Sequence, residues 1–179
     1  MIAHYLFITM KKVFSLLLNS CSIHTPLGTM IAIADENKLY LLDFIDSKYI
    51  QRHREQLHAT IIPGKNRILT LITTELNAYF AGNLKNFTTP VHFIGTDFQE
   101  KSWHALTTIA YGNTCSYAQE AIIVGNKNTH RAVANANSHN KLAIIVPCHR
   151  IIGVDGTLGG YASGIERKKW LLEHEKRNI

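Results

Sequence analysis

The sequence has few cysteines, and their arrangement excludes two common classes of small protein. The 179 residues include only Cys21, Cys115 and Cys148, an odd number with no C-x-x-C pair. A disulfide-stabilised scaffold and a cysteine-rich zinc site both need paired or clustered cysteines, so neither is supported and no metal is expected. Three isolated cysteines instead imply a reducing, cytoplasmic location.

Long apolar runs are also absent. No stretch approaches the roughly 18 apolar residues that a membrane-spanning helix needs, so no membrane partner is expected. Residues 1–20 superficially resemble a short export signal, but their apolar core of about six residues is shorter than the usual roughly 7–15. The stretch from Cys21 is already typical of a first strand. We therefore expect residues 1–20 to be an N-terminal extension, with Met10 as an alternative start.

Acidic residues are scarce in the second half of the chain. The net charge is +6, and residues 1–100 hold nine basic against eight acidic residues, whereas residues 101–179 hold ten against five. A basic C-terminal half suits a polyanionic partner, although a solvated basic surface would have the same composition. Between residues 113 and 150 the only acid is Glu120, against four basic side chains: Lys127, Arg131, Lys141 and Arg150.

The pattern of the first half predicts a small α/β domain over residues 21–92. Apolar residues 30–34 and 39–42 flank a polar turn, which predicts a β-hairpin. Apolar side chains recur every three or four residues from Arg67 to Ala81, which predicts an amphipathic helix ended by Gly82. Residues 83–96 contain Pro90 and Gly95 and lack a helical period, so they are expected to form a linker.

The second half, residues 93–179, is predicted to be mainly helical. Segments from Ser116 to about Gly125 and from Asn128 to Asn137 outline a helix-turn-helix, a weak signal by itself. The helix before them directs an apolar face, with Trp103, to the core. Three helix starts have the spacing of a capping box: Asp97-x-x-Glu100, Ser116-x-x-Gln119 and Ser163-x-x-Glu166.

Cys148 has unusual neighbours. An apolar run, residues 142–146, leads into Pro147-Cys148-His149-Arg150. A thiol reacts as the thiolate, and an adjacent histidine or cation commonly lowers its pKa or takes its proton. The local pattern alone still favours a buried structural cysteine slightly over a nucleophile.

Flanking motifs change this interpretation, because together they resemble the methylated-DNA–protein-cysteine methyltransferase family. The resemblance runs from about Ser22 to Glu175 and keeps the family's order. The motifs are Thr25-Pro26-Leu27-Gly28, Tyr79-Phe80-Ala81-Gly82, residues 95–99, residues 111–117, Arg131-Ala132-Val133, Asn140, Pro147-Cys148-His149-Arg150 and residues 160–168.

The resemblance implies both a fold and an activity. The fold is an α/β N-terminal domain, with a small antiparallel sheet and helices in a ribonuclease H-like arrangement, followed by a mainly α domain with a winged helix-turn-helix. The activity is DNA repair: O6-alkylguanine is flipped out of double-stranded DNA and its alkyl group passes irreversibly to a cysteine. The resemblance also implies that each molecule acts once, as a monomer in solution and without a cofactor. It leaves open whether O4-alkylthymine is a second substrate.

Four residues match the family's catalytic positions. Cys148 matches the nucleophile, and His149 matches a general base that acts on the thiol through a water. Glu175 matches the carboxylate that orients this histidine, and Tyr117 the hydroxyl that protonates or hydrogen-bonds the leaving guanine. Sequence alone would treat Glu175 as a solvated helix charge and Tyr117 as a core aromatic.

Further positions match DNA and pocket contacts. Arg131 matches the finger that fills the gap left by the flipped base. Asn140 matches the residue that ties the helix-turn-helix to the active-site strand, and Ile151 the residue that offers its backbone N–H to the base edge. The remaining DNA contacts are Thr129, Ala132, Ala134 and Asn135, and the remaining pocket residues are Pro147, Tyr161, Ala162 and Ser163.

The sequence departs from the family pattern on the DNA-facing helix. The family usually has Asn-Pro where this chain has Asn140-Lys141, and small residues where it has Thr129-His130. Ala134 and Asn135 also replace positions that are commonly glycine or alanine. These departures bear on DNA affinity and not on the reaction type.

Two other functions compete with alkyl transfer. A non-catalytic DNA-damage-binding module would have a bulky residue in place of Cys148. A cysteine hydrolase would need an oxyanion motif, and none is readable.

Overall fold

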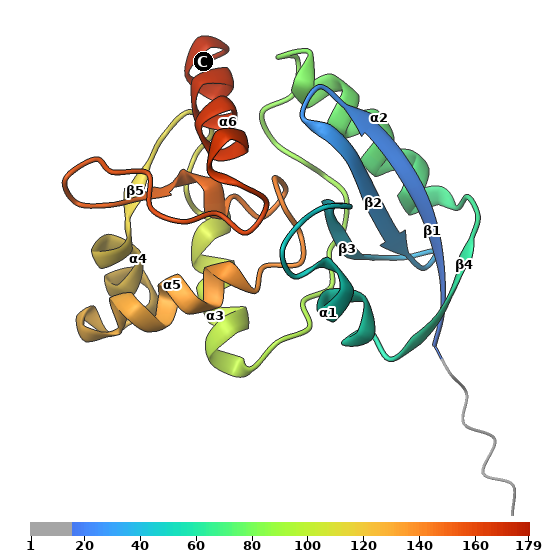
Figure 1. Ribbon diagram of the computed structural model, residues 1–179, viewed down its shortest axis with the longest axis horizontal. Coiled ribbons are helices and arrows are strands. Elements are labelled where there is room, and N and C mark those ends of the chain that lie inside the picture. Colours follow the sequence, from blue (N-terminus) through green and yellow to red (C-terminus); the bar gives the residue numbers. More distant parts are fainter. Residues whose placement is uncertain (1–15) are drawn as a thin grey trace, which may run out of the picture.

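The computed structural model describes residues 16–179, so the first 15 residues of the expected N-terminal extension lie outside the described part. Figure 1 shows two halves side by side, a sheet with α2 on the right and the C-terminal helices on the left. The elements, in chain order, are β1 Leu16–Thr25, β2 Gly28–Ala34, β3 Leu39–Phe44, α1 Ile50–Glu55, β4 Ala59–Pro63, α2 Arg67–Phe80, α3 Asp97–Thr107, β5 Cys115–Ser116, α4 Tyr117–Val124, the 3-10 turn η1 Lys127–Thr129, α5 His130–Ser138, the 3-10 turn η2 Cys148–Arg150, β6 Ile151–Ile152 and α6 Ile165–Arg177.

The N-terminal sheet has the strand order β3-β2-β1-β4. The predicted hairpin is confirmed, because β2 and β3 pair antiparallel, as do β1 and β2. The prediction of a wholly antiparallel sheet is wrong for one pair, since β4 runs parallel to β1. The chain crosses from β3 through α1 to the opposite edge of the sheet and therefore enters β4 in the direction of β1. Pairing with β4 also extends β1 back to Leu16, five residues before the expected start at Cys21.

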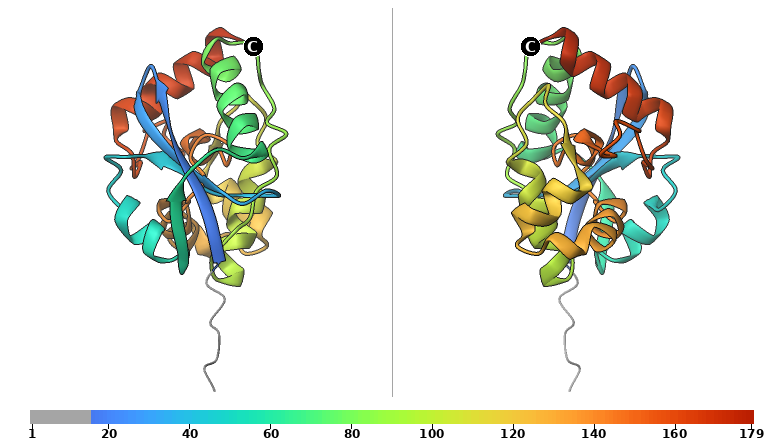
Figure 2. Two further views of the ribbon diagram at one scale, coloured as in Figure 1. Left: turned by 90° about the vertical axis from the view of Figure 1, so that its right-hand side faces the viewer. Right: turned by 90° about the vertical axis from the view of Figure 1, so that its left-hand side faces the viewer.

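Helix α2 covers the sheet as its apolar spacing predicted. The side views separate the two halves: the strands and α2 face the viewer on the left of Figure 2, and α3 to α5 on the right. Asn66 caps α2, since its side chain accepts a hydrogen bond from Leu69 N. The buried face, which includes Ile68, Ile72 and Leu76, joins the main core.

Of the three predicted capping boxes, one forms as expected, one is displaced by one residue, and one is absent. Ser116 and Gln119 form the expected box at α4. At α3 the box belongs to Thr96 and Gln99, one residue before Asp97. At α6 the cap is Gly164 at φ 100°, without a side-chain bond, because the Ser163 hydroxyl donates elsewhere, to Asp43.

The helix-turn-helix is formed by α4 and α5, with Gly125 in the left-handed region at φ 102° between them. The two helices bury Ala121, Val124 and Val133 against each other. Trp103 of α3 is only 1% exposed, which confirms its predicted place in the core. The short strands β5 and β6 pair in parallel beside α4.

The two halves share hydrogen bonds as well as a core. Leu42 of β3 accepts a bond from Ala143 N and donates one to the Lys141 carbonyl, both at 2.8 Å. The expected linker is held in the same way, because Leu39 bonds with Pro90 and His92. The segment that carries Cys148 is therefore fixed to the N-terminal sheet. None of the helices in residues 16–179 has the length and apolar character required to cross a membrane.

Candidate active site

Cys148 lies in the wall of a cavity of about 320 Å³ between the two halves. Five residues expected at the site meet there, although they are spread over the C-terminal half: Tyr117, Ala134, Cys148, Tyr161 and Ala162. Gly160, part of the motif at residues 160–168, also lines the cavity. The other lining residues were not expected: Lys48 and Tyr49 come from the N-terminal half, and Asn137 and Ser138 from the C-terminal half. Lys48 and Tyr49 follow β3 and had no motif to mark them.

Asn140 holds the nucleophile in place. Its side-chain Nδ2 donates to Cys148 Sγ at 3.2 Å and to the Val146 carbonyl at 2.8 Å, and its Oδ1 accepts from Leu142 N. These bonds link the end of α5 to the turn that carries the thiol. The expected active-site strand is not formed, because residues 143–145 are turns.

The electrostatics of the thiol differ from the sequence-based expectation. Burial raises the pKa of Cys148 to about 11, and the Asn140 hydrogen bond and the Lys168 charge oppose this only partly. The adjacent histidine side chain contacts Glu175 and does not lower this pKa. The thiol is therefore protonated near neutral pH, and its reaction requires a base to remove the proton.

His149 is arranged as such a base. Its Nε2 lies 2.8 Å from Glu175 Oε1, and both side chains are buried. Because a carboxylate only accepts hydrogen bonds, we assign the imidazole hydrogen to Nε2, which leaves Nδ1 as an acceptor. Nδ1 has no hydrogen-bond partner among the described residues. Burial lowers the pKa of His149, so the neutral form that can take a proton dominates.

Glu175 connects several elements at the base of the site. It accepts hydrogen bonds from Tyr79 on α2, the Gly112 backbone, His149 and Arg150. Burial by itself would raise the pKa of Glu175, but the bonds and charges of His149 and Arg150 outweigh it and hold the pKa well below its usual range. Glu175 is therefore a buried anion and not a solvated helix charge.

The expected basic surface is smaller than composition predicted. Arg150 is only 7% exposed because it pairs with Glu175, and Lys141 is 6% exposed because its Nζ donates to the Ile94 carbonyl. Lys127 and Arg131 remain exposed. Composition could not distinguish a buried ion pair from a solvated charge.

Lys168 is a site residue that the sequence analysis missed as an individual candidate. It is fully buried on α6, and its Nζ donates to the carbonyls of Ile151 and Gly160. Burial lowers its pKa to about 8, which the nearby Cys148 partly opposes. Helical spacing was the available signal, because Lys168, Leu171 and Glu175 repeat at three and four residues on one face.

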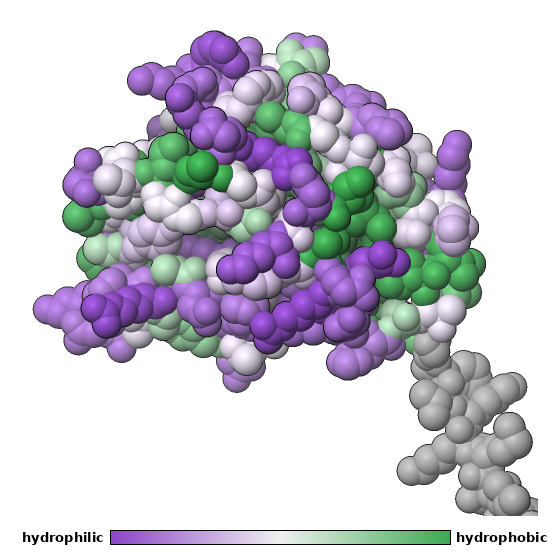
Figure 3. Space-filling view, in the orientation of Figure 1, coloured by the Kyte–Doolittle hydropathy of each residue, from purple (hydrophilic) through white to green (hydrophobic). Residues whose placement is uncertain are grey.

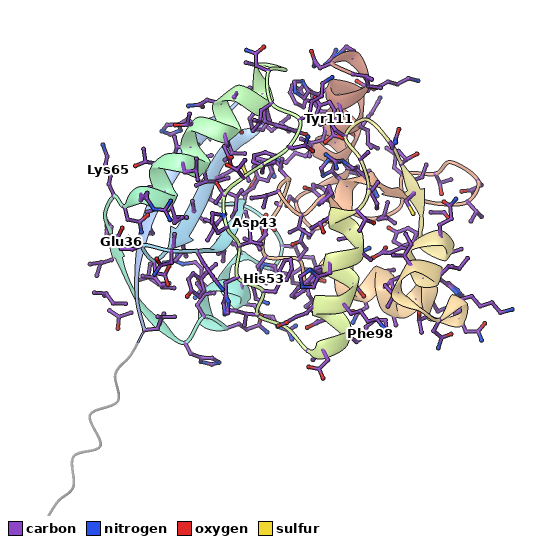
Figure 4. All side chains as sticks on the ribbon, turned by 180° about the vertical axis from the view of Figure 1, so that it is seen from behind. Glu36, Asp43, His53, Lys65, Phe98 and Tyr111 are labelled. Atoms are coloured by element: carbon purple, nitrogen blue, oxygen red, sulfur yellow. The ribbon has the colours of Figure 1, made fainter. Side chains whose placement is uncertain are left out.

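The loop that closes the cavity is attached to the N-terminal half. Ser163 Oγ donates to Asp43 Oδ1 at 2.9 Å, and the Ala162 carbonyl accepts from Lys48 N at 3.2 Å. Asp43 and His53, labelled in Figure 4, lie next to each other, with 3.6 Å between Oδ2 and Nδ1. The N-terminal half therefore helps to shape the cavity.

The remaining expected residues lie outside the cavity wall. Arg131, Ala132 and Asn135 are exposed on α5, and Thr129 donates to the Asn126 carbonyl just before it. Pro147 precedes the thiol and lines a separate cavity. The N–H of Ile151 donates to the Cys148 carbonyl and is therefore not free to meet a base in this conformation. No group of three or more metal-binding side chains occurs within residues 16–179.

Comparisons with known proteins find the same protein family in both halves of the chain. Residues 20–93 match the family "6-O-methylguanine DNA methyltransferase, ribonuclease-like domain", and residues 97–177 match its "DNA binding domain". A methylated-DNA–protein-cysteine methyltransferase from Methanosarcina barkeri is 40% identical over 88% of this chain and 96% of its own length. One from Mycobacterium tuberculosis is 43% identical over 87% of this chain and 90% of its own. The crystal structure of Mycobacterium tuberculosis OGT in complex with DNA superposes with a TM-score of 0.80, at 40% identity over 90% of this chain and 94% of that one.

Proposed function

The chain belongs to the 6-O-methylguanine DNA methyltransferase family, and on that premise we propose that Cys148 is the residue that accepts the alkyl group. The protein repairs DNA by direct reversal, as a methylated-DNA–[protein]-cysteine S-methyltransferase acting on O6-methylguanine. One observation carries the choice of cysteine. Of the three cysteines, Cys148 alone lines the cavity between Tyr117 and Tyr161, next to the His149–Glu175 pair.

Removal of the thiol proton begins the proposed reaction. His149 Nδ1 takes the proton of Cys148 through one water molecule, and the Glu175 carboxylate stabilises the resulting imidazolium. A buried thiolate is costly unless it reacts, because burial raises the pKa of Cys148 to about 11. Proton removal and alkyl transfer are therefore closely coupled.

Transfer moves one carbon from oxygen to sulfur. The sulfur attacks the alkyl carbon of a flipped O6-alkylguanine, an S–C bond forms, and the C–O6 bond breaks with its electron pair left on the guanine. Tyr117, in the cavity wall, donates a proton or a hydrogen bond to the guanine as it leaves. The product is a thioether that water does not cleave, so each molecule reacts once, without a cofactor.

Duplex DNA is the partner of the exposed face of α5. We assign Arg131 as the finger, because its long exposed side chain makes no hydrogen bond or ion pair with the described residues. Thr129, Ala132 and Asn135 flank it, and Ala134 turns toward the cavity. We further propose that the protein acts as a monomer in the cytoplasm, where its cysteines, all free in the structure, remain reduced.

Peptide mapping tests the proposal directly. The protein is incubated with a duplex that contains O6-methylguanine, and the mass of each cysteine peptide is measured. A single methyl group on the peptide with Cys148 is expected, whereas methylation of Cys21 or Cys115 would contradict the assignment. Cys148→Ala should bind the lesion without accepting the methyl group. Lesion binding without any methylated peptide in the unmutated protein would favour the non-catalytic binding module.

A further inference from the structure

A second cavity, of about 470 Å³, lies between α1 and the C-terminal end of α5. Arg52 and His58 reach it from the N-terminal half, and His139 and Lys141 from the C-terminal half. None of the described residues that line it is acidic. The cavity thus combines basic side chains from both halves of the protein.

Arg52 and Lys141 line this cavity together, and no acidic side chain among its described residues balances their charge. The side chain of Arg52 is exposed and makes no hydrogen bond or ion pair with the described residues. Lys141 is buried, and its Nζ donates to the Ile94 carbonyl and lies 5.4 Å from the centre of the Trp103 ring. Burial, and after it the charge of Arg52, lowers the pKa of Lys141 to about 8. An anion between the two cations would remove their repulsion.

The cavity opens beside the helix face assigned to DNA. Asn135 lines it and lies one helical turn after Arg131 on the exposed side of α5. The stacked rings of Tyr49 and His139, 5.5 Å apart, separate it from the active-site cavity. Figure 3 shows hydrophilic residues along the lower edge of the molecule, where Figure 1 places α5 and α1. A DNA strand that lies on α5 therefore passes the mouth of this cavity.

We propose that the cavity binds a backbone phosphate of the DNA, held by Arg52 and Lys141, so that the N-terminal half takes part in DNA binding. This rests on the proposed function only in placing DNA on α5. Arg52 can donate two parallel hydrogen bonds to phosphate oxygens, and Lys141 supplies a point charge from the C-terminal half.

Salt dependence of DNA binding tests the phosphate contact. Full-length protein is titrated with unmodified duplex at several salt concentrations, which avoids any alkyl transfer. Each lost phosphate contact reduces the slope of log K against log salt by about 0.9. Arg52→Gln should therefore bind more weakly at low salt, and its disadvantage should shrink by about 3.5-fold between about 50 and 200 mM salt.

Arg54→Gln is the matched control, because Arg54 is exposed on the same short helix and does not line the cavity. Its slope of log K against log salt should lie closer to that of the unmutated protein than the slope of Arg52→Gln does. Equal slopes for the unmutated protein and Arg52→Gln would overturn the proposal. Lys141→Met, checked for folding by its Tm, should repeat the Arg52→Gln result from the other wall.

Two further measurements separate the alternatives. Inorganic phosphate at constant ionic strength tests whether the cavity is a site for free anions. If phosphate raises the Tm of the unmutated protein, while Arg52→Gln binds DNA with the same salt slope as the unmutated protein, the DNA assignment is overturned. Alkyl transfer from free O6-methylguanine base should be equal in Arg52→Gln and unmutated protein, because the base carries no phosphate. If the unmutated protein accepts no alkyl group at all, the proposed function fails, but the salt slopes still decide the phosphate contact.

Discussion

Ser163 and Asp43 are 120 residues apart in sequence, and the Ser163 hydroxyl donates a 2.9 Å hydrogen bond to Asp43 Oδ1. Both side chains are buried, and Asp43 Oδ1 also accepts from Phe44 N at 2.8 Å. Strand β3 thereby anchors the loop that carries Tyr161 and Ala162 into the active-site cavity. The shape of the reaction site depends on this contact between halves.

Ser163→Ala should loosen this loop. Loss of the hydroxyl leaves Asp43 with one fewer donor and should cost roughly 1–2 kcal/mol of stability. Faster amide hydrogen exchange at residues 159–162 and slower methyl transfer are expected. Ser22→Ala, on the exposed surface of β1, is the control. Unchanged exchange in the loop would show that the Asp43 bond does not hold it.

Glu175→Gln should impair both stability and reaction. The substitution leaves buried Arg150 without its counter-charge, at a cost of roughly 3–5 kcal/mol, and removes the anion that stabilises protonated His149. Thermal unfolding and single-turnover methyl transfer measure the two effects. Glu173→Gln, exposed on the same helix, should change neither. Equal behaviour of the two variants would contradict the role of the buried carboxylate.

The same residue predicts an acid transition. The pKa of Glu175 is lowered in the folded protein, so its contribution to stability is complete above the ordinary value of 4.5 and is lost as the pH falls below it. Unmutated protein should lose stability steeply with falling pH in that range. In Glu175→Gln the free energy of unfolding should fall less steeply with pH in this range. An acid profile identical to that of the unmutated protein would show that Glu175 does not cause the transition.

Glu120→Gln should stabilise the protein at alkaline pH. Burial raises the pKa of Glu120 from 4.5 to about 7, so the stabilisation that comes from its protonated form is lost as the pH rises through about 7. The shift corresponds to roughly 3 kcal/mol. Glu120 Oε1 and Asn137 Oδ1 both lack partners among the described residues, and a glutamine amide could donate to the latter. Tm measured from pH 5 to 9 should fall less in the variant, and parallel curves would refute this.

Asn140→Ala should make Cys148 less reactive. The Asn140 hydrogen bond to Sγ lowers the pKa of Cys148, so its removal raises that pKa further above the ordinary value of 9.0. Alkylation of Cys148 by iodoacetamide should shift to higher pH, as peptide mass measurements can follow. Asn113→Ala, on an exposed turn, is the control. A profile unchanged from the unmutated protein would exclude Asn140 as a thiol ligand.

Local sequence patterns predicted the elements well where one face is apolar. The hairpin of β2 and β3, helix α2 and the α4 capping box lie where spacing placed them, because periodicity and capping are local properties of the chain. The parallel pairing of β4 with β1 was not predictable from either strand. Strand direction depends on where the crossover through α1 leaves the chain, which no local pattern encodes.

The sequence by itself determined the chemistry that is available: one thiol beside a histidine, a family of motifs in order, and a helix-turn-helix outline. Only the tertiary structure decided which charges are solvated and which are paired. It buried Arg150 against Glu175, turned Lys141 and Arg52 toward one cavity, and raised the pKa of Cys148, where the sequence had left open whether its neighbours lower that pKa or take its proton. Burial and charge pairing depend on residues far apart in the chain, and the free energy of a charged group depends on both.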